Sequence, residues 1–418
     1  MSNAAANMSV PNYAVVPMAE LDLQKPPTCI QFVPALEYPN YLVVGTYLLE
    51  PNQDVKMTDE FPKDSPMEEK PDMLRQQSRS GSLFLIEYAY SQLRIVHEIE
   101  CPSAVYHLQF LQGDSTIFVA ASSTGTISFY HVGEMHLTPA PQMKLLWASQ
   151  VFSADTIITY FEIISDEPSP LGSLITATTD TGGVYLMNYS LESRSVELLN
   201  DGMPITQHWV PWLDHEPDNV WCCASIDRGD QLKILSGSDS TILKCASITK
   251  HGNSPVEPHR AVNEVHKFHD AGVTAILPLP IQLGSSDLIL TGSYDEYIRL
   301  YSLQEKSVLA ELKLGGGVYR LKLVRQYLMK KVSYIILASC MHAGTKVLEV
   351  GMDLASETYT MKVIASLGVQ AEHYSYAADF QPLDVPEDHD YKQLCVSGNY
   401  VDRKIRVWEY DAEAEDRR

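Results

Sequence analysis

The sequence predicts an all-β protein, a seven-bladed β-propeller that is closed by an N-terminal strand in its last blade. The clearest observation is a hairpin pattern over 288–301, where an apolar run enters Thr291-Gly292-Ser293, passes a polar turn and leaves through alternating Ile298-Arg299-Leu300-Tyr301. Similar turn triplets recur along the chain. A length of 418 residues suggests two or three ordinary domains, yet one repeat-built ring holds this length as a single domain.

Six further turns align with Gly292-Ser293-Tyr294. They are Gly45-Thr46-Tyr47, Ala121-Ser122-Ser123, Ala177-Thr178-Thr179, Gly237-Ser238-Asp239, Ser339-Cys340-Met341 and Gly398-Asn399-Tyr400. Together with the upstream turn at His269, the anchor unit resembles the WD repeat, whose period is roughly 40 to 45 residues. Seven such units close a ring without free sheet edges.

Taken in order, residues 1–12 are small and polar, and we expect them to be disordered. The propeller is expected over 13–410. Its first inner strand is expected at 29–33, and the segment 13–23 before it is expected to pair beside 404–409 and so complete the last blade. Residues 411–418 form a charged tail. The ring therefore ties both ends of the chain together.

The first hairpin is interrupted by an insertion over 50–80. This segment contains four prolines among many charges of both signs, a composition that cannot bury enough apolar surface to fold alone. We expect a mobile loop on the face where the hairpin turns gather. It is either a tolerated surface insertion or a lid or partner-binding loop over the central funnel.

Composition narrows the function. The formal net charge of −22 argues against binding nucleic acid and leaves either a solvated acidic surface or attraction to a basic partner. The seven cysteines form no CxxC pair, which favours reduced, buried thiols in a cytoplasmic protein. No apolar run reaches the roughly 18 residues of a membrane span, and no secretory signal begins the sequence. We expect no membrane span and a monomer.

The motifs of the common enzyme classes are missing, including phosphate-binding loops, dinucleotide fingerprints and metal-binding helices. His269, Ser293 and Asp295 imitate a hydrolase triad. Their places before the inner strand, before the turn and within the turn instead predict a buried hydrogen-bond network that holds the blade together. An interaction scaffold is then the default function.

The sixth unit breaks this pattern. Cys340 takes the position of Ser293 and His342 that of Asp295, and a glycine run at 315–317 with Tyr319 and Arg320 adjoins them. Such a departure from the local rule favours function. Backbone N–H groups of the glycine turn with Arg320 could hold an oxyanion. The alternatives are that Cys340 is a small buried hydrophobe and His342 a satisfied or solvent-facing histidine.

The motifs TGSYDEYIRLY, 315–322 (GGGVYRLK), 338–344 (ASCMHAG) and Gly45-Thr46-Tyr47 resemble the WD-repeat family of diphthamide biosynthesis, often labelled diphthine methyltransferase. The resemblance spans nearly all seven blades and implies a carboxylic ester hydrolase. It would remove the methyl ester of methylated diphthine on elongation factor 2 and need no cofactor. Ser240 departs from the pattern, because it stands where the turn of the fourth unit should carry Asp.

For that reaction, His342 is the expected base and Tyr319 and Arg320 the contacts to the ester, with Cys340 as an alternative nucleophile. Aromatic faces and a carboxylate suit the trimethylammonium group of diphthine. The cage candidates, each also explained by ordinary packing, are Tyr47, Trp221, Tyr294 and Glu296. No metal ligand set is expected. The rival functions are a scaffold, such as an endosomal-recycling adaptor or a ubiquitin ligase substrate receptor, and a recognition module for a modified peptide.

Overall fold

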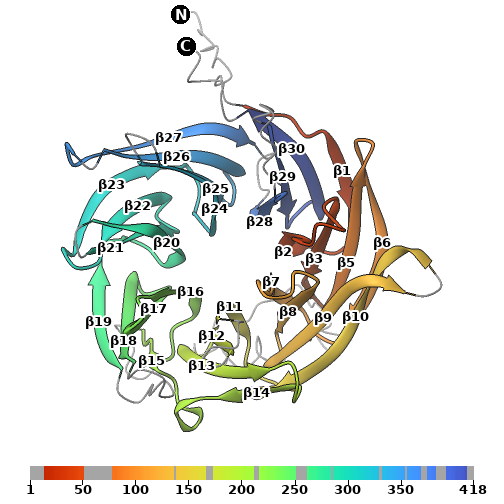
Figure 1. The fold of residues 1–418 in the computed structure, drawn as a ribbon, viewed down its shortest axis with the longest axis horizontal. Helices are drawn as coiled ribbons and strands as arrows, with labels where there is room; N and C mark the ends of the chain where they lie inside the picture. Colours follow the sequence, from red (N-terminus) through yellow and green to blue (C-terminus); the bar gives the residue numbers. More distant parts are fainter. Residues whose placement is uncertain are drawn as a thin grey trace, which may run out of the picture.

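The computed structural model describes residues 14–50, 78–135, 138–165, 173–210, 216–250, 261–283, 286–328, 332–353, 355–368, 374–382 and 392–411. These residues form seven antiparallel sheets arranged around a central axis (Figure 1). The predicted all-β, seven-bladed propeller is confirmed. The expected disordered N-terminus, 1–12, and nearly all of the charged tail, 412–418, lie outside the described residues.

Each blade is built of four main strands ordered from the axis outward, with one short additional strand in each of blades 1 and 3. Blade 1 contains β2 (Pro27–Phe32), β3 (Tyr41–Thr46), β4 (Leu48–Leu49), β5 (Arg79–Ala89) and β6 (Gln92–Cys101). Blade 2 contains β7 (Val105–Phe110), β8 (Ile117–Ser122), β9 (Thr126–Met135) and β10 (Thr138–Gln150). Blade 3 contains β11 (Ile158–Ser165), β12 (Ser173–Thr179), β13 (Gly183–Ser190), β14 (Ser195–Leu198) and β15 (Thr206–Gln207), with a short 3-10 turn at Asn200–Gly202.

The remaining blades follow the same order. Blade 4 contains β16 (Val220–Asp227), β17 (Gln231–Ser238), β18 (Ile242–Thr249) and β19 (Val262–Lys267). Blade 5 contains β20 (Val273–Leu283), β21 (Ser286–Ser293), β22 (Tyr297–Ser302) and β23 (Ser307–Lys313). Blade 6 contains β24 (Arg320–Leu328), β25 (Val332–Ser339), β26 (Thr345–Asp353) and β27 (Thr358–Leu367). Blade 7 contains β28 (Ser375–Phe380), β29 (Lys392–Asn399), β30 (Lys404–Asp411) and β1 (Ala19–Asp22).

The ring is closed by β1, as the sequence predicts. This N-terminal strand pairs antiparallel with β30, with Ala19 opposite Val407 and Asp22 opposite Lys404. Glu20 adds ion pairs to the side chains of Lys404 and Arg406. Because the first and last parts of the chain share one sheet, both chain ends are tied to the same blade.

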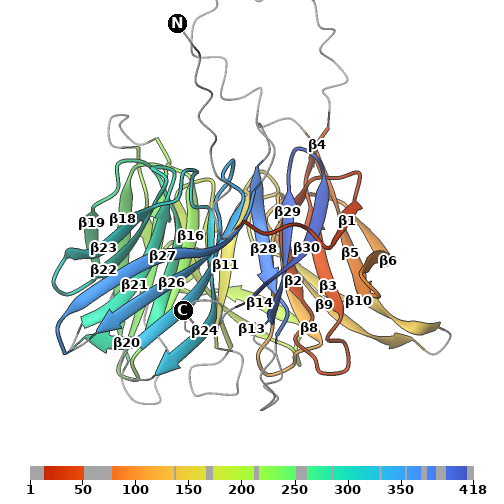
Figure 2. The same ribbon diagram turned by 90° about the horizontal axis from the view of Figure 1, so that it is seen from above.

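The insertion in the first hairpin is shorter than expected. Leu48 and Leu49 pair with Ser80 and Arg79 on β5, and the Glu50 N–H donates to the carbonyl of Ser78. Figure 2 shows β4 projecting from one face of the ring. These backbone bonds extend the hairpin ladder at both ends of the expected 50–80 loop, so only its central part, 51–77, lies outside the described residues.

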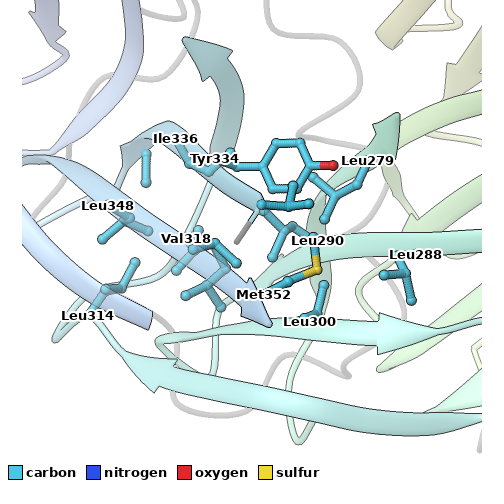
Figure 3. Close-up of a cluster of buried hydrophobic side chains, with 14 of the residues drawn as sticks. Leu279, Leu288, Leu290, Leu300, Leu314, Val318, Tyr334, Ile336, Leu348 and Met352 are labelled. Atoms are coloured by element: carbon cyan, nitrogen blue, oxygen red, sulfur yellow. The ribbon is translucent and has the colours of Figure 1, made fainter. Parts of the chain in front are cut away.

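Apolar side chains from adjacent blades pack into shared clusters, which the alternation along each strand supplies. The largest cluster joins blades 5 and 6 (Figure 3), where Leu290 and Leu300 meet Val318, Ile336 and Leu348, all at most 1% exposed. Each such side chain contributes roughly 1.5–3 kcal/mol when buried. Neighbouring blades therefore stabilise each other.

Hydrogen bonds near the axis add a second link between neighbouring blades. Asp379 accepts the N–H of Phe32 at 2.7 Å, Gln31 that of Phe110 at 3.0 Å, and Gln109 that of Ile163 at 3.1 Å. Each acceptor occupies the same place on its inner strand. These side-chain acceptors therefore pair inner-strand N–H groups at the boundaries between neighbouring blades.

All seven cysteines are free thiols, and six of them are buried. No helix in the described part of the chain is long and apolar enough to cross a membrane.

Candidate functional site

One residue of each inner strand and one of each hairpin turn come together at the same end of the ring axis. On the inner strand this is the unpaired residue of the bulge, such as Thr274 between Val273 and Ala275. On the hairpin it is the second residue after the glycine position, such as Tyr294. Because the blades repeat, the register alone places equivalent residues around the axis. Many of them are aromatic.

We call this set the aromatic collar. It consists of Tyr47, Tyr106, Trp221, Tyr294, Tyr319, Tyr376 and Tyr400. Ring centroids connect much of it: Tyr106 to Tyr47 at 5.6 Å, Tyr47 to Tyr400 at 6.1 Å, Tyr400 to Tyr376 at 5.6 Å and Tyr376 to Tyr319 at 4.8 Å. Every collar residue is partly exposed. The collar therefore offers aromatic faces to a ligand at the end of the axis.

Arg320 reaches across the axis just below the collar. Its Nη1 donates to the carbonyls of Tyr319, Thr274 and Trp221 at 2.9, 3.1 and 3.3 Å. Its Cζ lies 4.1 Å from the ring centroid of Tyr319 and 4.7 Å from that of Tyr160. Three carbonyls and two rings fix the planar guanidinium, and no described carboxylate forms an ion pair with it. A fixed cation of this kind suits an anionic or developing negative charge.

Trp221 connects Arg320 to a carboxylate. Its backbone carbonyl accepts from the guanidinium, while its indole Nε1 donates to Asp239 at 2.6 Å. Partial desolvation raises the pKa of Asp239, although Trp221 and Asn219 donate to it. Tyr294 lies beside Asp239 across Gly272. The carboxylate beside Trp221 and Tyr294 is therefore that of Asp239, which occupies the turn position equivalent to that of Tyr294.

Glu296, the carboxylate expected in the cage, lies elsewhere. It has a positive φ of 72° in the hairpin turn, and its Oε2 is 3.2 Å from the Nζ of Lys313 on β23. The ion pair directs the side chain toward the outer strand. Tyr47, Trp221 and Tyr294 do belong to the collar, whereas Glu296 does not.

Blade 5 contains the buried polar network. His269 Nε2 lies 2.9 Å from Thr291 Oγ1, and its Nδ1 lies 2.9 Å from Asp295 Oδ2. Arg299 donates to the same carboxylate oxygen at 2.6 Å. Ser293 Oγ accepts the N–H of Asp295 at 3.1 Å. We call these residues the polar staple. Because their hydrogen-bonding groups are paired with one another inside the blade, we do not expect them to bind substrate.

Blade 4 has its own version of the staple. His208 lies 2.9 Å from both Ser236 Oγ and Ser238 Oγ, and Ser238 Oγ lies 2.9 Å from Ser240 Oγ. Ser240 stands at the position of Asp295, and its backbone N–H donates to Asp218 Oδ2 at 3.0 Å, which fixes the turn. Hydroxyl groups therefore replace the carboxylate that the sequence leads one to expect in this turn.

Blade 6 replaces the staple by apolar packing. The register confirms the alignment, since Arg320, Ser339 and Thr345 pair as Ala275, Gly292 and Ile298 do. Cys340 is 0% exposed and belongs to the apolar cluster of blades 5 and 6, and burial raises the pKa of its thiol to about 12. A sealed, protonated thiol is a poor nucleophile.

The glycine run before β24 serves close packing. A Cβ on Gly316 would lie 2.2 Å from the carbonyl oxygen of Cys340, and one on Gly317 would lie 2.5 Å from the sulfur of Met341. Gly315 has a positive φ of 82°. The turn after β25 therefore lies directly against this link, where larger residues would collide.

His342 is exposed at the rim of the same face. Its ring lies 6.5 Å from Tyr374, whose ring lies 6.0 Å from Tyr376 of the collar. The structure thus separates the four expected catalytic residues. Tyr319 and Arg320 lie at the axis, and Cys340 lies inside the blade. His342 lies at the rim, where the ring of Tyr374 separates it from Tyr376 of the collar.

Sequence reasoning missed Asp239 and several collar residues because it aligned hairpin turns and left the inner strands unaligned. Aligning the bulge residues would have added Tyr106 and Tyr376 to the predicted Tyr319. The alignment of the third turn was also one residue off: Tyr160 pairs with Thr178, so Asp180 takes the place of Tyr294. The run Ala177-Thr178-Thr179 offers no internal mark to set its register. Among the described residues no cluster of three or more His, Cys, Asp or Glu side chains could hold a metal.

Comparison with curated proteins finds several relatives, including three from different organisms. The chain is 23% identical over 378 residues to the protein named diphthine methyltransferase of Schizosaccharomyces pombe, covering 89% of this chain and 91% of that protein. It is 20% identical over 321 residues to the diphthine methyltransferase homolog of Dictyostelium discoideum, covering 75% and 78%. It is 24% identical over 285 residues to human diphthine methyltransferase, covering 65% of this chain and 56% of the human protein. No protein-family model matches the chain.

Solved structures support the fold. Sqt1 of Chaetomium thermophilum bound to the N-terminus of the ribosomal protein L10 has a TM-score of 0.53 at 12% identity, covering 95% of this chain and 100% of that one. Sqt1 of Saccharomyces cerevisiae has a TM-score of 0.55 at 10% identity, covering 95% and 99%. At such identities the likeness concerns the propeller alone.

Proposed function

We propose that the chain belongs to the WD-repeat family that includes the proteins named diphthine methyltransferase, to which it is 20–24% identical, and that it acts in diphthamide biosynthesis as an ester hydrolase. The proposed reaction removes the methyl ester of methylated diphthine on elongation factor 2 and releases methanol and diphthine. The observation that carries the proposal is the guanidinium of Arg320, fixed on the ring axis beneath an aromatic collar without a described carboxylate partner.

The cationic end of the substrate has a matching place in the collar. A trimethylammonium group binds to aromatic faces and gains from a nearby carboxylate. Trp221, Tyr294 and Asp239 supply both features, and the indole of Trp221 holds Asp239 in position. Binding of a cation there also offsets the partial desolvation that raises the pKa of Asp239.

The ester end has a matching place at Arg320. Ester hydrolysis passes through a tetrahedral intermediate whose oxygen carries negative charge, and fixed donors that face this oxygen lower the barrier. Arg320 is held in place before substrate arrives, so little reorganisation is needed. Tyr319 stacks on the guanidinium and belongs to the collar, so it joins the two ends of the site. The reaction needs water and no cofactor.

The other two expected catalytic residues have different places in this proposal. His342 at the exposed rim is positioned to contact the protein part of elongation factor 2 around the modified side chain. Cys340 supports the blade from its apolar cluster. A cytoplasmic location follows from the proposed substrate.

The test is methanol release from methylated elongation factor 2 by the purified protein, with the mass of the factor followed in parallel. We expect a loss of one methylene mass from the factor and one equivalent of methanol. Arg320→Met keeps the side-chain length without its charge and should lower kcat on the order of 10²–10³-fold. Arg325→Met, on the same strand, is the matched control and should retain activity.

A scaffold would release no methanol, and its partner binding would be insensitive to Arg320→Met. A recognition module would bind the modified factor without releasing methanol. Either result from the wild-type protein would overturn the proposed function.

A further inference from the structure

Below the collar, a second set of residues occupies one equivalent place on each inner strand. Its members are the residues that follow the bulge on each inner strand. His107 pairs with Ala121, Tyr160 with Thr178 and Arg320 with Ser339, so these three occupy equivalent places in blades 2, 3 and 6. The equivalent residues in the other blades are Cys29, Cys222, Ala275 and Ala377. The polar members therefore come from blades 2, 3 and 6, and Arg320 reaches across the axis from blade 6 to Tyr160 of blade 3.

The ring of Tyr160 contacts both of the other polar members. The imidazole of His107 lies 4.1 Å from it between ring centroids, tilted by 32°, and the Cζ of Arg320 lies 4.7 Å from its centroid. The imidazole also packs edge-on against Phe161 at 5.1 Å. These contacts fix the orientation of His107 by packing, without using its nitrogen atoms.

His107 differs in this respect from the buried histidines of the described structure. His208 and His269 each have both ring nitrogens in hydrogen-bond contact with other side chains, and His266 lies 3.1 Å from the hydroxyl of Tyr301. Neither nitrogen of His107 bonds to a described residue, and neither is sealed from solvent. Since polar groups inside proteins are almost always paired, an accessible, unpaired imidazole beside a fixed guanidinium indicates a missing partner such as a water or a ligand.

The surroundings keep His107 uncharged. Burial lowers its pKa well below the ordinary value, and the positive charges of Arg320 and Lys322 on β24 lower it further. Tyr160 of β11 faces it as a neutral phenol, because burial raises the pKa of that hydroxyl. At neutral pH His107 is therefore the free imidazole, which can accept a proton.

We infer that His107 is the general base of the proposed ester hydrolysis and that a water bound to its ring nitrogen is the nucleophile. This inference rests on the proposed function. His107 takes a proton from the water as the water oxygen bonds to the ester carbonyl carbon, and the resulting oxyanion faces Arg320. The intermediate then collapses: the bond from carbon to the methoxy oxygen breaks, and His107 returns its proton to that oxygen as methanol leaves. The new carboxylic acid releases its proton to solvent.

The first experiment compares three variants in the methanol-release assay with methylated elongation factor 2. His107→Gln should lower kcat about 10²–10⁴-fold with KM little changed, because a general base acts in the transition state. His131→Gln, on β9 of the same blade, is the matched control and should retain wild-type kcat. His342→Ala should raise KM and change kcat less than His107→Gln does. A kcat for His107→Gln within threefold of wild type would overturn the inference while leaving the proposed function intact.

The second experiment separates catalysis from structural support. His107→Ala should keep the thermal transition within a few degrees and regain activity when imidazole is added. The kcat of the wild type should fall only well below pH 6.5. The kcat of the imidazole-rescued variant should fall near the ordinary pKa of an imidazole, about 6.5. Folded His107→Ala that imidazole cannot rescue would overturn the assignment. Absence of methanol release from the wild type would overturn both the proposed function and this role.

Discussion

Blades 5 and 6 close in opposite ways, although they are neighbours and share one apolar cluster. Blade 5 uses the polar staple, in which His269, Thr291 and Asp295 bond to one another. At the equivalent positions blade 6 has Leu314, Ala338 and His342, with Cys340 in place of Ser293; the first two and Cys340 are buried in the cluster. Apolar packing of Leu314, Ala338 and Cys340 therefore takes the place of the polar staple in blade 6.

The contrast between blades 5 and 6 indicates that the functional site lies outside the staple positions. A polar residue of the staple has all its partners inside the blade, whether or not it imitates a catalytic triad. Arg320 and His107 instead point to the axis, at strand positions that the staple never uses. Positions that repeat in every blade but differ in chemistry are thus better guides to the site than a broken staple.

The largest expected effect breaks the polar closure itself. His269→Ala removes both bonds of the imidazole. Thr291 Oγ1 keeps its 3.4 Å hydrogen bond to the carbonyl of Arg299, but Asp295 loses a partner inside the blade, and the free energy of unfolding should fall by about 3 kcal/mol. Denaturant unfolding measures this loss of stability.

Leu314→Ala tests the apolar closure of blade 6 and should lower the free energy of unfolding by about 2–4 kcal/mol through the cavity it leaves. A cost below 1 kcal/mol for either variant would contradict the idea that both closures carry the blades.

Cys340→Ser gives the next largest effect. The substitution puts a hydroxyl into an apolar cluster, where the thiol makes a polar contact of 3.6 Å to the carbonyl of Ala338, and it should cost about 1–3 kcal/mol. Cys340→Ala is the companion variant. If Cys340 only packs, both variants keep wild-type kcat in the methanol-release assay at a temperature where they are folded; loss of turnover in folded Cys340→Ala would make the thiol a nucleophile.

The smallest effect concerns a polar group at the seam between blades 3 and 4. Burial raises the pKa of Glu162 to about 8, although Ser225 donates to it, and its Oε2 is buried without a partner. Because the folded pKa lies above the unfolded value, the protonated acid favours folding at acid pH, and this contribution is lost as the pH rises through about 8. Glu162→Gln should therefore gain thermal stability relative to wild type between pH 6 and pH 9.

A matched variant sharpens this test. Gln109 has the equivalent place at the seam between blades 2 and 3, where it accepts the N–H of Ile163. Gln109→Glu introduces the same acid there and should lose stability relative to wild type over the same pH range. Thermal scans of both variants at pH 6 and pH 9 measure the two shifts, and parallel curves for Glu162→Gln and wild type would remove Glu162 from the pH dependence.

The sequence by itself determined the seven units, the closing strand and the hairpin register of every unit except the third. Strand alternation and turn chemistry are local, so they can be read without coordinates, and the run at 290–301 is a clear example. The same reasoning placed Tyr319 and Arg320 beside each other and Tyr47, Trp221 and Tyr294 on one face. It also named His269, Ser293 and Asp295 of the polar staple, because these follow from positions within a single repeat, but it did not name Thr291 and Arg299.

Only the tertiary structure decided which side chains from different blades meet. Ring closure brings His107, Tyr160 and Arg320 together from positions more than fifty residues apart in the chain. It also decided that Lys313 takes Glu296 away from the collar and that Trp221 holds Asp239. Such contacts depend on the register of each inner strand and on the rotation between blades, and no local pattern in the sequence encodes either.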